Sequence, residues 1–125
     1  MAPPKKRLLV VEDEEAIRES LVLGLSDYGW DVTEACDSHA ALEFDTPFDI
    51  YLIDMQLPDQ DGIELGRLIG KRFGKVPIVL LTGYLNGQLQ DMADKNNISL
   101  VLRKPFRFEE LDRALKALVR PRKAR

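Results

Sequence analysis

The sequence predicts an α/β fold in which a five-stranded parallel sheet has helices on both faces. Short apolar runs without polar alternation recur along the chain, and such runs are typical of strands that are buried on both faces. Segments with helical spacing of apolar residues separate these runs. A regular alternation of strand and helix gives a parallel sheet with right-handed crossovers. With 125 residues, the chain has room for one domain with one core.

The five predicted strands are four continuous apolar runs and one weaker segment. The weaker segment follows Tyr28-Gly29, a typical turn signal. All five are short, which favours strands over helices for apolar runs of this kind. In chain order the predicted strands span residues 8–11, 32–36, 50–53, 78–81 and 100–102.

Helical periodicity fills the intervals between the strands. Ile17, Leu21 and Leu25 share one helix face, and the acidic residues 13–15 before them suit the positive end of a helix dipole. Residues 111–118 repeat this apolar spacing near the end of the chain. Further helices are predicted over residues 39–44, 63–73 and 88–95, and the first of these is short because Pro47 follows it.

Composition narrows the function classes. The net charge is −3 with a sequence pI near 5.2, and no basic stripe runs through the body, so nucleic acid is not expected as its partner. Basic residues gather instead toward the ends, where an N-terminal tail at 1–6 and a basic C-terminal tail or start of a linker at 120–125 are predicted on either side of a domain at 7–119. Cys36 is the single cysteine and is expected to be half-buried. No apolar run is long enough for a membrane span, so a cytoplasmic protein is expected.

Polar residues capable of chemistry follow the predicted strands. The first strand ends at Glu12 and Asp13, the third at Asp54 and the fourth at Thr82, while Lys104 comes shortly after the fifth. The carboxyl ends of parallel strands share one edge of a sheet, and open sheets of this type bind ligands at that edge. The sequence therefore predicts that three acids, a hydroxyl and an ammonium group converge there.

This set of residues suits phosphoryl transfer assisted by a metal ion. Three neighbouring carboxylates repel one another, and a hard divalent cation such as Mg²⁺ or Mn²⁺ relieves the repulsion better than zinc would. Asp54 can be the oxygen nucleophile, while Thr82 and Lys104 contact phosphoryl oxygens. Asp13 is expected to bind the metal directly and Glu12 through water. His39, the only histidine, is expected on a helix surface.

Four segments resemble the signature blocks of bacterial response-regulator receiver domains. They are Leu9 to Glu14 (LVVEDE), Asp49 to Gly62 (DIYLIDMQLPDQDG), Leu81 to Gly83 (LTG) and Lys104 to Phe106 (KPF). Their order and approximate spacing match the family. The resemblance as a whole extends over the chain from Arg7 to Val119. One such block is only suggestive, whereas four in register are specific.

The resemblance implies a flavodoxin-like (βα)5 sheet in strand order 2-1-3-4-5 and Mg²⁺ as cofactor. The metal ligands would be Glu12, Asp13, Asp54 and the main-chain carbonyl of Gln56. A sensor histidine kinase or phosphotransfer protein would phosphorylate Asp54, and the module would catalyse only its own phosphorylation and dephosphorylation. The signal would alter the face formed by the fourth helix, fifth strand and fifth helix, with homodimerisation as one outcome. Lys104 and Pro105 would be joined by a cis peptide bond.

The chain departs from the family pattern in its output region. Three positions before the lysine, where the family usually has an aromatic ring, it has Val101. Tyr84 either supplies a mobile ring in its place or is an ordinary surface residue. The second helix is also about one turn short. Glycines recur every fourth residue in the third helix, at Gly62, Gly66, Gly70 and Gly74. They make this helix labile, or they form a close-packing face, or they are tolerated without a structural role.

Two other functions compete with phosphoryl acceptance. A haloacid-dehalogenase-type phosphatase also has an aspartate nucleophile after a strand, but it needs a second aspartate two residues later, where this chain has Gln56. The alternative is a receiver-like interaction module that is never phosphorylated. Such modules typically lack an acid or the lysine, and this chain keeps the full set.

Overall fold

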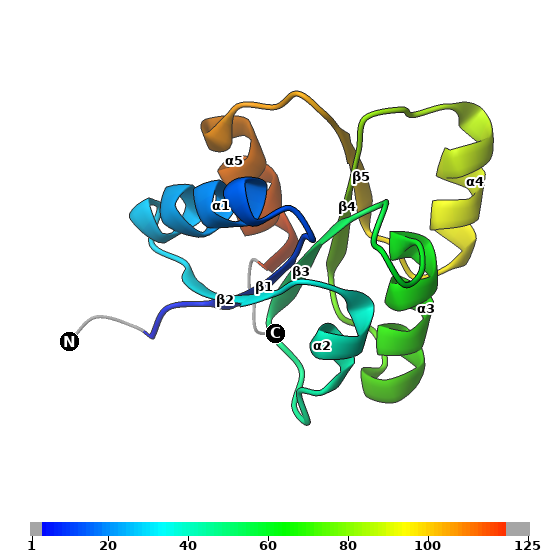
Figure 1. The fold of residues 1–125 in the computed structure, drawn as a ribbon, viewed down its shortest axis with the longest axis horizontal. Coiled ribbons are helices and arrows are strands. Elements are labelled where there is room, and N and C mark those ends of the chain that lie inside the picture. Colours follow the sequence, from blue (N-terminus) through cyan, green and yellow to red (C-terminus); the bar gives the residue numbers. More distant parts are fainter. Residues whose placement is uncertain (1–3, 120–125) are drawn as a thin grey trace, which may run out of the picture.

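The computed structural model describes residues 4–119, in which strands and helices alternate five times (Figure 1). The predicted tail at 120–125 and residues 1–3 lie outside the described residues. No helix within 4–119 is long and apolar enough to cross a membrane. The elements are β1 (Arg7–Val11), α1 (Glu15–Asp27), β2 (Asp31–Ala35), α2 (Ser38–Leu42), β3 (Ile50–Asp54), α3 (Gly62–Phe73), β4 (Ile78–Thr82), α4 (Gly87–Lys95), β5 (Leu100–Arg103) and α5 (Phe108–Val119).

The sheet has the predicted parallel arrangement. Its strand order is β2-β1-β3-β4-β5, which confirms the flavodoxin-like order 2-1-3-4-5. The chain passes from β1 outward to β2 and then returns across β1 to β3, so the winding direction reverses between β1 and β3. Helices α1 and α5 cover one face of the sheet, and α2, α3 and α4 cover the other (Figure 1).

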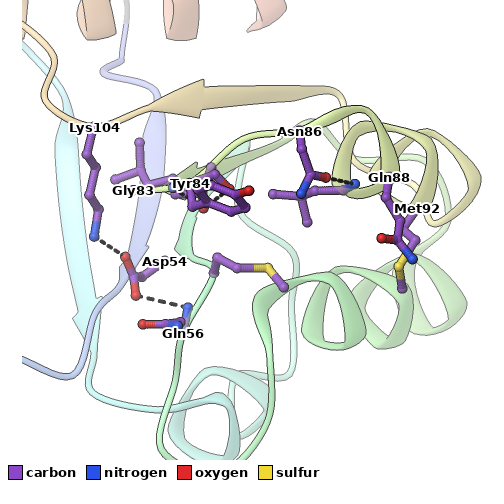
Figure 2. A pocket seen from close by; sticks show the side chains of 12 residues that line it. Asp54, Gln56, Gly83, Tyr84, Asn86, Gln88, Met92 and Lys104 are labelled. Carbon is purple, nitrogen blue, oxygen red and sulfur yellow. Dashed lines mark hydrogen bonds and ion pairs between the residues drawn. The ribbon is translucent and has the colours of Figure 1, made fainter.

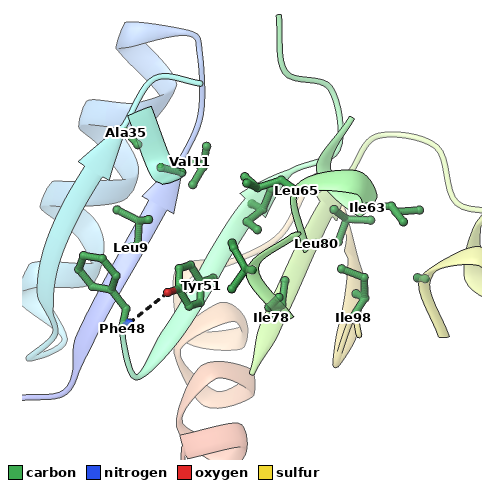
Figure 3. Packing of buried hydrophobic residues seen from close by; sticks show 14 of the residues in the cluster. Leu9, Val11, Ala35, Phe48, Tyr51, Ile63, Leu65, Ile78, Leu80 and Ile98 are labelled. Carbon is green, nitrogen blue, oxygen red and sulfur yellow. Dashed lines mark hydrogen bonds between the residues drawn. The ribbon is translucent and has the colours of Figure 1, made fainter. Parts of the chain in front are cut away.

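Each face of the sheet has its own apolar core. Leu9, Tyr51 and Leu80 pack under α2, α3 and α4 (Figure 3), whereas Leu8 and Ile50 pack under α1 and α5. Neighbouring residues of a strand point to opposite faces, so both sets must be apolar when both faces are covered. This explains why the predicted strands are continuous apolar runs rather than alternating ones.

Several element boundaries differ from the predicted ones by a residue or two. The predicted strand at 32–36 is β2, which begins and ends one residue earlier. The predicted helix at 39–44 is α2, which begins at Ser38 because the Asp37 side chain accepts a hydrogen bond from the Ala40 N–H at 2.8 Å. Its five residues confirm that this helix is short. Cys36 is exposed, so the expectation of a half-buried thiol was wrong; it lies just beyond the end of β2. His39 is exposed on α2, as predicted.

The glycines of α3 form a close-packing face, which decides between the three alternatives. A Cβ on Gly62 would lie 2.6 Å from the main-chain oxygen of Asp54 and 2.6 Å from Leu80. Similar additions at Gly66 and Gly70 would meet side chains of the segment that leads into β5. Helix α3 can therefore approach the sheet only because these positions lack side chains. Gly74, with a φ of 81°, ends the helix.

A buried polar contact fixes α5 to the start of β2. The indole N–H of Trp30 donates a 2.8 Å hydrogen bond to Asp112 Oδ1, and both residues are buried. Lys116 pairs with the other carboxylate oxygen at 3.1 Å. The buried carboxylate thus has a partner on each oxygen, as a buried charge requires. Trp30 is the only tryptophan, so its fluorescence reports on the folded state.

Replacing Gly62 by alanine tests the close approach of α3 to the sheet. Alanine is the better helix former by up to about 1 kcal/mol, but its methyl group would meet the Asp54 carbonyl, and overpacking costs about 1–3 kcal/mol. We therefore expect a lower free energy of unfolding, measured with urea and Trp30 fluorescence. Gly87→Ala is the control, because its added Cβ meets nothing within 4 Å, and it should keep or slightly raise stability. Equal stabilities for the two variants would refute the close approach.

Candidate functional site

The predicted polar residues meet at the carboxyl edge of the sheet. Asp54 and Thr82 are the last residues of β3 and β4, while Glu12 and Asp13 directly follow β1. One carboxylate oxygen from each of the three acids lies within 4.8 Å of the other two. Lys104 follows β5 and pairs with Asp54. The structure therefore brings together all five side chains that the sequence singled out.

Both oxygens of the Asp54 carboxylate have a donor. Lys104 Nζ forms an ion pair with Oδ1, and the main-chain N–H of Gln56 donates to Oδ2 at 3.0 Å (Figure 2). Asp54 is 6% exposed, so the pair lies in a partly desolvated setting. The peptide bond between Lys104 and Pro105 is cis, as the family resemblance implied. A hydrogen bond of 2.7 Å from the Lys104 N–H to the Thr82 carbonyl fixes the main chain before it.

The loop after Asp54 is closed at its base. The Gly62 N–H donates to the Met55 carbonyl at 2.7 Å, and Gln56 and Asp61 form an isolated antiparallel bridge. Farther out, the Asp59 carboxylate accepts hydrogen bonds from the first two N–H groups of α2 at 3.2 and 3.0 Å. Gln56 is therefore held at the edge of the site by the main chain.

Glu12 is the least exposed acid of the cluster. It is 1% exposed, and one of its oxygens accepts a hydrogen bond from the Glu14 N–H at 3.1 Å. The other oxygen, Oε1, has no hydrogen-bond partner among the described residues. Burial raises the pKa of Glu12, and the charge of Asp54 adds to that rise, whereas the Glu14 hydrogen bond and Lys104 lower it. An unsatisfied oxygen in an all-carboxylate cluster fits a hard divalent cation such as Mg²⁺.

Arg18 belongs to the site, although the sequence analysis did not identify it. Its Nη1 donates to the carbonyls of Glu12 and Asp13 at 2.9 and 3.3 Å, and its Nε donates to Glu34 Oε1 at 2.8 Å. Two of its acceptors are main-chain atoms, which every residue has. Its place early in the helix after the acid pair was the only available signal.

The hydroxyl of Thr82 is tied to the loop that follows β4. Thr82 Oγ1 donates to the Tyr84 carbonyl and accepts from the Tyr84 N–H, both at 3.1 Å. The Tyr84 side chain itself is 74% exposed, which fits the alternative of a surface residue. Val101, by contrast, is buried in the core under α3 and α4. The exposed ring of this region thus lies on the β4–α4 side.

A cleft of about 450 Å³ runs from the acid cluster to α4. Figure 2 shows Asp54 and Lys104 at one end and Met92 at the other, with Tyr84 between them. The apolar part of the lining comes from Met55, Leu81, Leu89 and Met92. One end of the cleft can therefore accept an anion beside Lys104, whereas the other can accept an apolar group.

Comparison with known proteins agrees with this geometry. The family model for the response regulator receiver domain matches residues 8–116. This chain belongs to the receiver-domain family. Receiver domains are non-enzymatic signalling modules of two-component response regulators, which receive phosphoryl groups from histidine kinases, and they bind Mg²⁺ through an acidic pocket.

Curated relatives include stand-alone and longer proteins. A probable transcriptional regulatory protein of Picosynechococcus is 32% identical over 125 residues, which are 93% of this chain and 50% of the relative. The response regulator receiver protein CpdR of Brucella abortus is 33% identical over 108 residues, or 85% of this chain and 90% of the relative. The receiver chain thus spans about half the length of the first relative and nearly all of the second.

Solved receiver structures share the fold. A CheY-like receiver domain protein from Methanospirillum hungatei has a TM-score of 0.86 and 26% identity, with 92% of this chain and 94% of that chain covered. The non-phosphorylated HemR receiver domain of Leptospira biflexa has a TM-score of 0.86 and 27% identity, with 97% and 99% covered. The likeness extends over the whole sheet and its helices.

Replacing Glu12 by glutamine should stabilise the metal-free protein at pH 8 by about 1 kcal/mol, because glutamine removes a buried negative charge that lies beside Asp13 and Asp54. Because the pKa of Glu12 is raised in the folded protein, Glu12 binds a proton more readily in the folded state than in the unfolded state. Its contribution to unfolding free energy therefore grows as the pH falls through its folded pKa toward its unfolded pKa. The stability difference between wild type and variant should shrink over that range.

Urea unfolding with a chelator present, at several pH values, measures this difference. Glu19→Gln is a matched control, because Glu19 is an exposed glutamate on α1 outside the cluster. A difference between wild type and Glu12→Gln that did not change with pH would contradict the raised pKa.

Proposed function

We propose that residues 7–119 form a phosphoacceptor domain in which Asp54 accepts a phosphoryl group. The observation that carries this proposal is the pairing of the Asp54 carboxylate with Lys104 beside the acid cluster, at the mouth of an open cleft. A carboxylate oxygen of Asp54 would attack phosphorus in a phosphorylated histidine of the partner. The P–N bond would break, and its electron pair would leave with the imidazole nitrogen.

The other residues of the site would have distinct roles. Lys104 would pair with one phosphoryl oxygen, and the Thr82 hydroxyl would donate a hydrogen bond to another. The carboxylates of Glu12, Asp13 and Asp54, with the main-chain carbonyl of Gln56, would hold Mg²⁺. When bound, that ion would supply positive charge that neutralises the phosphoryl oxygens. On this proposal the module catalyses only its own phosphorylation and dephosphorylation, with a sensor histidine kinase or phosphotransfer protein as donor.

The two competing functions have less support. A phosphatase of the haloacid-dehalogenase type needs an acid two residues after the nucleophile, and here Gln56 contributes its main-chain N–H to Asp54 instead. An interaction module without phosphorylation would not need an ammonium group paired with a buried carboxylate in a cleft. Phosphoryl acceptance gives each of these groups a role.

Thr82 offers a route by which the signal leaves the site. A hydroxyl has one proton, and in this structure that proton is donated to the Tyr84 carbonyl. Donation to a phosphoryl oxygen would break this bond and release the main chain of residues 83–86. We propose that the Tyr84 ring then enters the apolar part of the cleft beside Met55 and Met92, which would alter the face formed by α4, β5 and α5.

Asp54→Ala tests phosphoryl acceptance. Wild type treated with acetyl phosphate and Mg²⁺ should gain the mass of one phosphoryl group, and the variant should not, because it lacks the nucleophile. Intact-mass spectrometry measures the gain, and sedimentation of the beryllofluoride-treated protein reports whether a homodimer forms. A gain of mass that persisted in Asp54→Ala would assign the reaction elsewhere.

Thr82→Ala and Tyr84→Ala test the proposed route. In wild type with beryllofluoride and Mg²⁺, NMR should show a shifted Tyr84 ring resonance with new contacts to Met55 and Met92 methyl groups. Thr82→Ala should abolish that shift, because no hydroxyl remains to change partners. Tyr84→Ala should also change homodimerisation or partner binding, whereas the control Tyr28→Ala, at an exposed tyrosine on the C-terminal end of α1, should not. An unshifted Tyr84 ring in wild type would refute the route.

A further inference from the structure

Arg18 connects three segments around the acid pair. It lies in the first turns of α1, and its side chain is 15% exposed. One nitrogen of its guanidinium donates to the carbonyls of both Glu12 and Asp13, and another donates to Glu34 on β2. The planar guanidinium group has several donors in fixed directions, so it can hold such acceptors at the same time.

The acceptors of Arg18 belong to the turn that carries the acid pair. The Glu12 N–H donates to the Ala35 carbonyl of β2 at 3.1 Å, and the Glu14 N–H donates to the Glu12 carboxylate at 3.1 Å. These two bonds fix the N–H side of the turn, and Arg18 fixes its carbonyl side. The orientation of the Glu12 and Asp13 carboxylates relative to Asp54 follows from the position of this turn.

The ion pair with Glu34 reduces the repulsion between the Arg18 charge and a cation at the acid cluster. An uncompensated positive charge held on the main chain of the acid pair would repel a cation at the cluster and so lower its affinity. The Arg18–Glu34 ion pair, at 2.8 Å, offsets that charge while it fixes the direction of the side chain. The arrangement retains the hydrogen bonds of an arginine and reduces its electrostatic cost.

We propose that Arg18, braced by Glu34, is a positioning residue for the metal site: it holds the Glu12–Asp13 turn in the geometry that binds a divalent cation. This inference rests on the proposed function, because it assigns a residue to the same site. It predicts the direction in which cation affinity changes when Arg18 is removed. If Arg18 acted only through its charge, its removal would strengthen cation binding. If it positions the acid pair, its removal weakens cation binding.

Mg²⁺ titration by calorimetry compares the affinities of unphosphorylated wild type, Arg18→Met and Arg18→Lys and so shows the direction of the change. Loss of residues that orient metal ligands typically lowers metal affinity about 10–100-fold, so we expect Arg18→Met to bind Mg²⁺ about tenfold more weakly. Arg18→Lys keeps the charge without the planar donor set and should recover only part of the affinity. Tighter or unchanged binding in Arg18→Met would overturn the proposal.

Three comparisons separate positioning from a general loss of structure. Arg67→Met is the matched control, because Arg67 pairs with Glu64 on α3 away from the acids, and it should bind Mg²⁺ as wild type does. Unfolding followed by Trp30 fluorescence establishes that each variant is folded. Glu34→Ala should also weaken binding, and combining it with Arg18→Met should add little, because the two residues act as one unit. A fully additive double variant would contradict the brace.

Phosphorylation then distinguishes this inference from the proposed function. In Arg18→Met, the Mg²⁺ concentration that gives half-maximal phosphorylation by acetyl phosphate should rise about tenfold, while the rate at saturating Mg²⁺ stays near the wild-type value. Wild type that binds Mg²⁺ but never gains a phosphoryl group would overturn the proposed function alone. Wild type and Arg18→Met that are phosphorylated with the same Mg²⁺ dependence would overturn the role of Arg18 alone.

Discussion

The mutual repulsion of three carboxylates at one edge of the sheet is the constraint on which the rest of the structure depends. Glu12 and Asp54 are buried, and together with Asp13 they bring ligand oxygens within 4.8 Å of one another. Such a cluster opposes folding unless other groups compensate it. The Lys104 ammonium pairs with one acid, and main-chain N–H groups donate to two. On the proposed function, a divalent cation would relieve the remaining repulsion between these carboxylates.

The two apolar cores supply the stability that this cluster requires. Each strand contributes residues to both faces of the sheet, and helices cover both faces. Asp54 and Thr82 are therefore held by the sheet itself, and Glu12, Asp13 and Lys104 directly follow strands of the same sheet. On the β4–α4 side of the site, the Thr82 hydroxyl is hydrogen-bonded to the main chain of the exposed Tyr84.

The sequence predicted the sheet and the five polar residues at its edge because both depend on local patterns. Continuous apolar runs mark strands covered on both faces, and residues that end parallel strands must converge. The sequence did not predict contacts that depend on tertiary structure. Arg18 binds main-chain carbonyls, which have no sequence signature. The α3 glycines left three alternatives until the approach of Gly62 to the Asp54 carbonyl was visible. The exposure of Cys36 depended on where β2 ends.

The closed base of the β3–α3 loop has a consequence for the evolution of this domain. The Gly62–Met55 hydrogen bond and the Gln56–Asp61 bridge join the two ends of the loop, so residues 57–60 project beyond a base that is closed next to Asp54. A substitution at the exposed Pro58 would leave this closure in place. Asp59, at the same tip, accepts hydrogen bonds from the first N–H groups of α2, so the tip lies beside the start of that helix. The surface at this tip can therefore vary while the closed base keeps its geometry beside Asp54.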